Sequence, residues 1–144
     1  MSANFKKFEF LDITTADAAF VSFGKDLNEV FSNAGLALFE IITDTKNVET
    51  KQERKIEVTG HDLKSVMYSW LSELLFISSS ENILFSKFKV ELNEDEFTLR
   101  AKCWGEEIDL DKHELKAEVK AITYHKMEIK KEDSLWKAQI IVDI

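Results

Sequence analysis

The chain has 144 residues, of which 44% are hydrophobic, so it is long and apolar enough to form one domain with a sizeable core. Its 27 acidic and 19 basic residues give a formal net charge of −8, which argues against direct binding of nucleic acid. No apolar run approaches the roughly 18 residues that a membrane span needs. The lone Cys103, predicted to be a core residue in a strand, fits a reducing, cytoplasmic setting.

The first predicted elements are two short strands, "FEFLDIT" at residues 8–14 and "DAAFVSF" at residues 17–23, after a flexible N-terminus over residues 1–7. Asp17 lies at the start of the second strand, in the stretch "TTADAAF". Strands disfavour aspartate, and a buried carboxylate needs a partner. Asp17 is therefore predicted to be either exposed to solvent or bound to a ligand that neutralises its charge.

Two amphipathic helices are predicted, each with an aspartate as its N-cap. In "KDLNEVFSNAGLALFEIITD" apolar residues recur at helical spacing after Asp26, and Glu29 forms a box-like pair with this cap. A strand is predicted at residues 53–60, where "ERKIEVTG" alternates. The second helix follows Asp62 in "HDLKSVMYSWLSELLFISSS" and is expected to end at the serines of residues 78–80.

Beyond the second helix the apolar period changes from 3.6 to 2, which indicates strands. "NILFSKFKVEL" at residues 82–92 and "FTLRAKCW" at 97–104 flank the turn "NEDE" and form a predicted hairpin. Further strands are expected at residues 114–125, 126–132 and 135–144. The predicted fold class is therefore α+β, a single compact domain with two amphipathic helices packed on a largely antiparallel β-sheet.

The sequence carries no strong catalytic motif. It has no glycine-rich phosphate loop, no Cys or His pair at zinc spacing and no nucleophile elbow. Its three histidines, His61, His113 and His125, are far apart and are expected in turns or on the surface. The acidic stretch "DLDKHE" at residues 109–114 lacks the glycine and the final glutamate of a calcium loop, so a solvated turn is predicted there.

The last strand ends on Asp143 and the apolar Ile144. Period-2 alternation places Trp136, Ala138, Ile140, Val142 and Ile144 on one face of this strand. The side chain of Asp143 and the terminal carboxylate of Ile144 then lie within a few ångströms of each other. A cation could hold such a pair together; periodicity alone favours two solvated carboxylates.

The ordered set of segments resembles the archease family, small proteins that assist the tRNA-splicing ligase. The resemblance extends from about residue 8 to residue 144, and its most specific parts are T-A-D near the start, E-V-K-A-I-T-Y-H late in the chain and a terminal D-I. Many members read H-T-A-D, where this chain has Thr14 in place of the histidine. They also have Ile or Val after the aspartate, where this chain has Ala18. Both departures leave Asp17 in place. They put in doubt any role for the histidine of the family motif, but not the role of the carboxylate.

The resemblance implies a metal site, described as calcium, built from Asp17, Asp143 and the terminal carboxylate of Ile144. Three carboxylates, completed by water and backbone carbonyls, would suit the roughly 6–8 oxygen ligands that calcium takes. The same oxygen ligands would also accept another divalent cation, so the identity of the metal stays open. The segment at 114–125 would contribute Lys116, Lys120 and His125 to a contact with the ligase, although solvated side chains explain these lysines about equally well.

The function implied by the resemblance is non-enzymatic. The chain would promote guanylylation of the tRNA-splicing RNA ligase at its active-site histidine and so allow multiple turnover in tRNA processing. The ligase would bind the RNA and perform the chemistry, in the cytoplasm. Two alternatives stay open: a chaperone-like modulator of RNA- or DNA-processing proteins, and a small metal-dependent hydrolase that uses Asp17 and Asp143.

Overall fold

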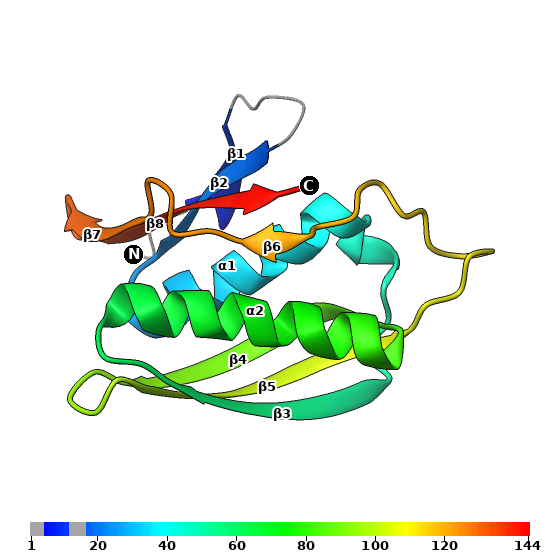
Figure 1. The fold of residues 1–144 in the computed structure, drawn as a ribbon, viewed down its shortest axis with the longest axis horizontal. Coiled ribbons are helices and arrows are strands. Elements are labelled where there is room, and N and C mark those ends of the chain that lie inside the picture. The colour runs from blue at the N-terminus through cyan, green and yellow to red at the C-terminus, as the bar shows by residue number, and fades with distance from the viewer. Residues whose placement is uncertain (1–4, 12–16) are drawn as a thin grey trace.

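Two antiparallel sheets lie on opposite sides of a layer formed by the two long helices (Figure 1). The computed structural model describes residues 5–11 and 17–144. The elements in chain order are β1 (Phe8–Phe10), β2 (Asp17–Gly24), α1 (Leu27–Ile42), the 3₁₀ turn η1 (Thr45–Asn47), β3 (Gln52–Thr59), α2 (Leu63–Glu81), β4 (Ile83–Asn93), β5 (Thr98–Glu107), β6 (Ala121–Ile122), β7 (Glu128–Glu132) and β8 (Leu135–Asp143). Neither of the two long helices is long and apolar enough to cross a membrane, and the described residues contain no other helix of that length.

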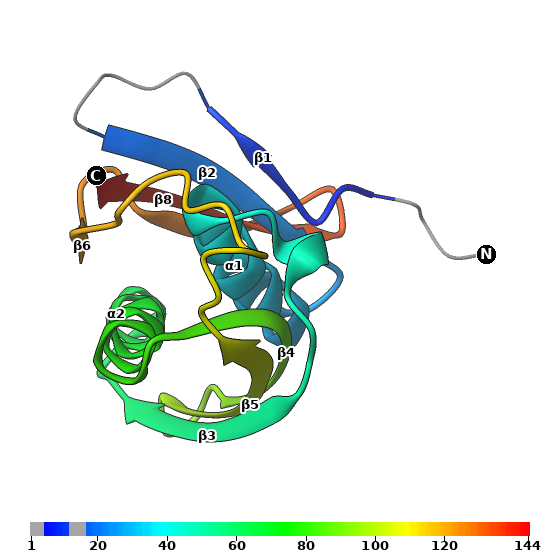
Figure 2. The ribbon, with the colours of Figure 1, turned by 90° about the vertical axis from the view of Figure 1, so that its right-hand side faces the viewer.

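The α+β class predicted from the sequence is confirmed, but the strands divide into two sheets. One sheet has the order β1-β2-β8-β6, with β7 also paired to β8, and the other has the order β3-β5-β4. Viewed end-on, the helices lie between the two sheets (Figure 2). The sequence predicted one sheet with helices on one face, so the second sheet, on the other side of the helices, was not predicted. Alternation within a strand shows which face is buried, but it does not show which strands share a sheet.

Each helix begins where an aspartate caps it. The Asp26 carboxylate accepts a hydrogen bond of 2.8 Å from the Glu29 amide, and Glu29 in turn accepts from the amide of Lys25. The Asp62 carboxylate accepts from the amide of Ser65, whose hydroxyl completes a capping box. α2 was predicted to end within the serines at residues 78–80, but it continues through them to Glu81. Asn82, in the left-handed conformation, forms its C-cap.

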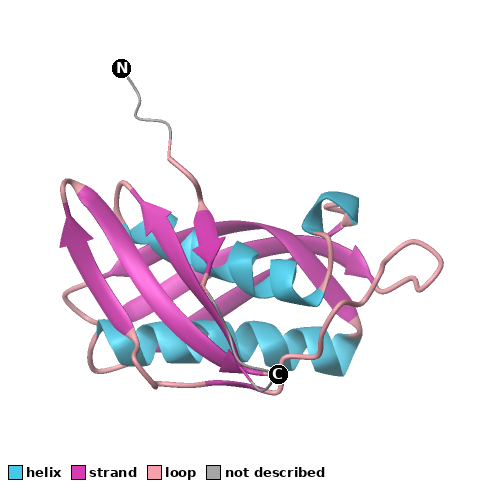
Figure 3. Ribbon diagram, turned by 90° about the horizontal axis from the view of Figure 1, so that it is seen from above, coloured by secondary structure: helices cyan, strands magenta, loops and turns pink. Residues whose placement is uncertain are grey.

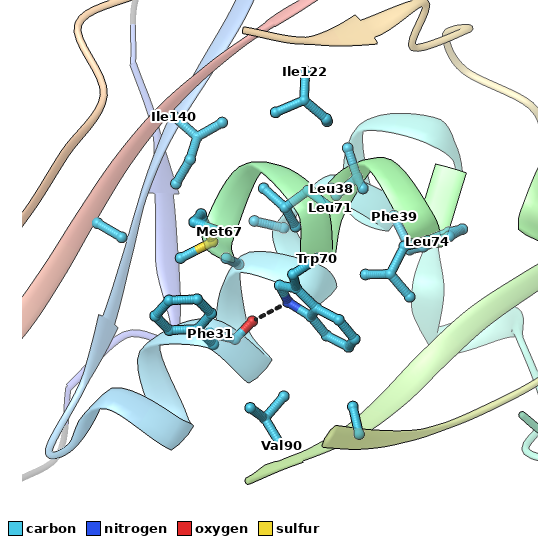
Figure 4. Packing of buried hydrophobic residues seen from close by; sticks show 14 of the residues in the cluster. Phe31, Leu38, Phe39, Met67, Trp70, Leu71, Leu74, Val90, Ile122 and Ile140 are labelled. Atoms are coloured by element: carbon cyan, nitrogen blue, oxygen red, sulfur yellow. Dashed lines mark hydrogen bonds between the residues drawn. The ribbon is translucent and has the colours of Figure 1, made fainter. Parts of the chain in front are cut away.

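The helix layer supplies most of the core. Trp70 of α2 is fully buried, and its indole N–H donates 2.9 Å to the carbonyl of Phe31 in α1 (Figure 4). This hydrogen bond satisfies the polar atom of a large buried side chain and fixes the two helices against each other. Cys103 is also fully buried, as predicted, and desolvation raises the pKa of its thiol to about 12. That thiol is therefore a core group and a poor nucleophile.

The segment before β6 is a correction to the sequence prediction of a strand at 114–125. Only Ala121–Ile122 pair in the sheet, while Leu115 forms an isolated bridge to Thr43. The amide of Lys116 donates to the carbonyl of Ile42 at the end of α1. The segment has the alternation of a strand but follows the surface between α1 and β8, so its hydrogen bonds are scattered rather than laddered.

Candidate functional site

The first and last long strands of the chain are neighbours in the five-stranded sheet. β2 and β8 pair antiparallel along their whole length, from Gly24 opposite Trp136 to Asp17 opposite Asp143. Seen from above, these strands run side by side over the helices, and the C-terminus lies at the end of β8 (Figure 3). The pairing brings together two aspartates that are far apart in the sequence.

Asp17 and Asp143 lie on the outer face of this sheet. Ala18 and its partner Val142, one position along, are buried against the helices. Because successive side chains point to opposite faces, the aspartates project away from the core, with Asp143 exposed and Asp17 half-buried. Residues directly opposite each other in an antiparallel pair have Cβ atoms about 4.5–5.5 Å apart, and like charges there destabilise the sheet.

Ile144 holds the end of the chain in place. Its side chain packs against the hydrophobic core, on the face predicted by alternation. The backbone beside it is also fixed, because the Asp143 carbonyl accepts a 2.7 Å hydrogen bond from the amide of Lys120 and Asp143 pairs with Ala121 of β6. The terminal carboxylate therefore follows Asp143 at a fixed point of the sheet.

The donor set suits a hard cation. Asp17 and Asp143 offer carboxylate oxygens, and neither forms an ion pair with a described basic side chain. Within residues 5–11 and 17–144 no three His, Cys, Asp or Glu side chains gather as a metal cluster. A cation bound by the pair would therefore need further oxygens, such as the terminal carboxylate, backbone carbonyls or water. Thr14 lies outside the described residues.

The three residues predicted to contact a partner lie in different surroundings. Lys116 pairs weakly with α1, its Nζ 3.7 Å from the Glu40 carboxylate. Lys120 adjoins the aspartate pair through its backbone hydrogen bond to Asp143. His125 is exposed in the turn before β7, where its amide donates to the Thr123 hydroxyl. The structure thus brings the backbone of Lys120 beside Asp143 and leaves Lys116 at the other end of the segment.

A buried polar cluster was missed by the sequence prediction, which placed His113 in a turn or on the surface. Its ring is buried, with Nε2 3.1 Å from Glu106 Oε2, while Nδ1 accepts the amide of Asp109 at 3.0 Å. Because Nδ1 is an acceptor, Nε2 carries the proton. Glu106 also accepts from the Glu49 amide at 2.7 Å and pairs with Lys112 at 2.8 Å.

The Glu106 cluster ties the loop at residues 109–113 to β5 and to Glu49. Burial alone would raise the pKa of Glu106, but the hydrogen bonds from the Glu49 amide, Lys112 and His113 outweigh it and lower the pKa to about 2. The turn at Asp109–Lys112 is exposed, as predicted, but the ring of His113 is buried and the ammonium group of Lys112 reaches back to Glu106. The signal available in the sequence was a histidine between charged residues, which does not distinguish a buried ring from an exposed one.

Known proteins resemble this chain over nearly its whole length. The pattern of the Archease protein family matches residues 8–144. "Protein archease" of Methanothermobacter thermautotrophicus is 53% identical over 141 residues, covering 96% of this chain and 99% of that protein. "Protein archease" of Sulfurisphaera tokodaii is 44% identical over 139 residues, again with 96% and 99% covered.

Two solved structures share the architecture. The solution structure of Methanobacterium thermoautotrophicum protein 1598 superposes with a TM-score of 0.84 at 52% identity, covering 96% of this chain and 99% of that one. The crystal structure of a Thermotoga maritima protein described as an archease and possible chaperone gives a TM-score of 0.64 at 17% identity, covering 99% and 100%. At that identity the second likeness concerns the fold alone.

Proposed function

The chain belongs to the archease family, and from this premise we propose that it activates the tRNA-splicing RNA ligase rather than catalysing a reaction itself. In this proposal it promotes guanylylation of the ligase's active-site histidine and so permits multiple turnover in tRNA processing. Support comes from family membership over nearly the whole chain. A helper without its own chemistry also agrees with the inert Cys103 and with the structural use of His113.

We further propose that Asp17 and Asp143, with the terminal carboxylate of Ile144, hold a calcium ion. The observation that carries this proposal is the register that sets the two aspartates directly opposite each other. A bound divalent cation would neutralise like charges at the point where the first and last strands meet. Asp17 and Asp143 would supply carboxylate oxygens from two strands, and the packed Ile144 side chain would orient the terminal carboxylate.

Activation would work by selection of a ligase conformation. An activator shifts an equilibrium only by binding the competent state more tightly than the resting state. The end of the sheet at Asp17 and Asp143 would dock near the ligase's active site. Of Lys116, Lys120 and His125, Lys120 has its backbone nearest to this end, through its hydrogen bond to Asp143. Lys116 and His125 would contribute only if the contact extends along the segment or over the turn before β7.

The test is a guanylylation assay with the RNA ligase of the same organism. The protein should be inactive alone and should increase ligase guanylylation and ligation turnover at substoichiometric amounts. Asp17→Asn should lose this stimulation, whereas Asp95→Asn, an equal charge change in the turn between β4 and β5, should retain it. The proposal fails if the wild-type protein gives no stimulation, or if Asp17→Asn stimulates fully.

The hydrolase alternative predicts a different result. It requires turnover of a phosphate or acyl ester by the isolated protein with added divalent cation, abolished by Asp17→Asn. Stimulation of the ligase without any such turnover would exclude it. The chaperone-like alternative predicts instead that the protein prevents aggregation of unrelated RNA- or DNA-processing proteins and that guanylylation is unchanged.

A further inference from the structure

Three lysines lie in one row across the outer face of the three-stranded sheet. Lys102 of the central strand β5 is directly opposite Lys55 of β3 on one side and Lys89 of β4 on the other, and all three are exposed. Directly opposite side chains have Cβ atoms about 4.5–5.5 Å apart, and like charges in such positions repel. We call this set the lysine row.

The rows on either side are charge-matched, so the repulsion is confined to the lysine row. On one side Glu57, Arg100 and Glu91 alternate in sign, and Arg100 Nε lies 3.6 Å from the Glu57 carboxylate. On the other side Lys87 Nζ lies 4.9 Å from the centre of the Trp104 ring. Among the ion pairs of the described residues, none includes Lys55, Lys89 or Lys102.

The sheet face differs in charge from the chain as a whole. Five basic side chains project from it against three acidic ones, although the chain carries a net charge of −8. The basic ones are Lys55, Lys87, Lys89, Arg100 and Lys102, and the acidic ones are Glu53, Glu57 and Glu91. No described element covers this face, because both helices pack on the opposite one (Figure 2). A local positive field of this kind attracts a polyanion. The expectation of no nucleic-acid binding rested on the net charge and on the lack of an arginine cluster, and it left a local lysine patch open.

Trp104 decides which polyanion fits best. Its half-buried indole lies on the same face as the lysine row, two residues along β5 from Lys102. A nucleic acid offers phosphates to lysines and bases to an aromatic ring, and an aromatic ring on a sheet face is a known platform for unpaired bases. An acidic peptide would engage the lysines alone, whereas a base would also stack on the indole, in place of Lys87 Nζ, which lies over the ring.

We propose that this face binds single-stranded nucleic acid, with phosphates on the lysine row and a base on Trp104. The row spans two interstrand gaps, about 10 Å in all, which limits it to a few phosphates and hence to weak, salt-sensitive binding. The proposal does not involve Asp17 or Asp143 and stands independently of the calcium site and of ligase activation.

Fluorescence anisotropy with a labelled oligouridylate tests the lysine row. For three phosphates on a single strand, log K should fall with log[KCl] with a slope of about −2, and binding should be detectable at about 50 mM salt. Lys55→Gln/Lys89→Gln/Lys102→Gln should weaken binding at least tenfold and remove most of that slope. The matched control is Lys25→Gln/Lys64→Gln/Lys131→Gln, which changes three exposed lysines elsewhere by the same charge and should bind like wild type.

Tryptophan fluorescence tests the stacking half of the proposal. Oligouridylate should quench wild-type emission, inorganic polyphosphate should not, and Trp104→Phe should lose the quenching while circular dichroism confirms its fold. Equal weakening by the two triple variants, or no binding at low salt, would overturn the proposal. Polyglutamate that displaces the oligonucleotide at equal charge concentration would overturn it in favour of an acidic protein partner.

Discussion

Both sheets set like charges directly opposite each other, but the two places differ in kind. Asp17 and Asp143 lie opposite each other at one end of the β2–β8 pair, beside the packed Ile144, so any bound ion would lie next to backbone that is paired in the sheet. Lys55, Lys102 and Lys89 lie on an open sheet face, where long side chains can spread apart. The first arrangement suits a small cation with several ligands, and the second suits an extended polyanion.

The Glu106 cluster shows what a compensated charge looks like in the same molecule. Its buried carboxylate has an amide, a lysine and a histidine as partners. Neither the aspartate pair nor the lysine row has such partners among the described residues. Uncompensated like charges are costly, and this is the reason for which we propose both places as binding sites.

The largest predicted effect concerns calcium and the aspartate pair. Calcium at about 100 times its dissociation constant should raise the free energy of unfolding of the wild-type protein by about 2.7 kcal/mol. Asp17→Asn should show at most about half of this increase, because an affinity at least tenfold weaker leaves calcium at no more than about ten times the dissociation constant of the variant, and Asp95→Asn should show all of it. Chemical denaturation with calcium or with chelator measures the difference. If calcium raises the free energy of unfolding of Asp17→Asn as much as that of the wild-type protein, Asp17 is not a calcium ligand and the aspartate pair is no cation site.

An effect of similar size on the free energy of unfolding is expected when the buried Glu106 is replaced. Glu106→Gln should lower the free energy of unfolding by about 1–3 kcal/mol, since the neutral amide loses the negative charge that Lys112 pairs with at Oε2 and places an N–H₂ donor group in the site of a carboxylate oxygen. Urea denaturation near neutral pH measures the loss. A variant as stable as wild type would mean that the cluster contributes no more than an exposed ion pair.

The same residue predicts an acid-sensitive window. Because folding lowers the pKa of Glu106 from 4.5 to about 2, its contribution is complete above about pH 4.5 and is lost as the pH falls toward 2. The stability difference between wild type and Glu106→Gln should therefore shrink over this window. Denaturation curves at several pH values below 5 test it, and a difference that stays constant down to pH 2 would contradict the assignment.

The smallest predicted effect belongs to the lysine row without ligand. Lys102→Gln removes the central charge of the row and should raise the free energy of unfolding by about 0.2–1 kcal/mol at low salt. Arg100→Gln, on the same strand but between two glutamates, should not stabilise the protein. High salt should reduce the Lys102→Gln gain, because screening weakens repulsion between exposed charges. A destabilised Lys102→Gln would show that the row is not repulsive.

Local signals in the sequence predicted the local structure well. Asp26 and Asp62 were predicted as caps because a helix start needs acceptors for its free amides, and both serve that role. The hairpin of β4 and β5 followed from alternation around a polar turn. These features depend on residues within a few positions of one another, so a single chain contains enough information to predict them.

Features that depend on distant residues could not be derived from pattern alone. Periodicity gave no reason to place Asp17 opposite Asp143, and only the family resemblance joined them before the register was known. The lysine row likewise could not be predicted, because Lys55, Lys89 and Lys102 become neighbours only once the register of three strands is known. His113 was misplaced because its partner Glu106 reaches it only after the loop folds inward.

Calorimetric titration of calcium into the metal-free protein tests the central claim most directly. We predict one binding event for wild type and for Asp95→Asn, with the affinity reduced at least about tenfold in Asp17→Asn and in Asp143→Asn. Deletion of Ile144 should also weaken binding, because it moves the terminal carboxylate off its anchored position while keeping its charge. Wild-type affinity in both Asp17→Asn and Asp143→Asn would contradict the account.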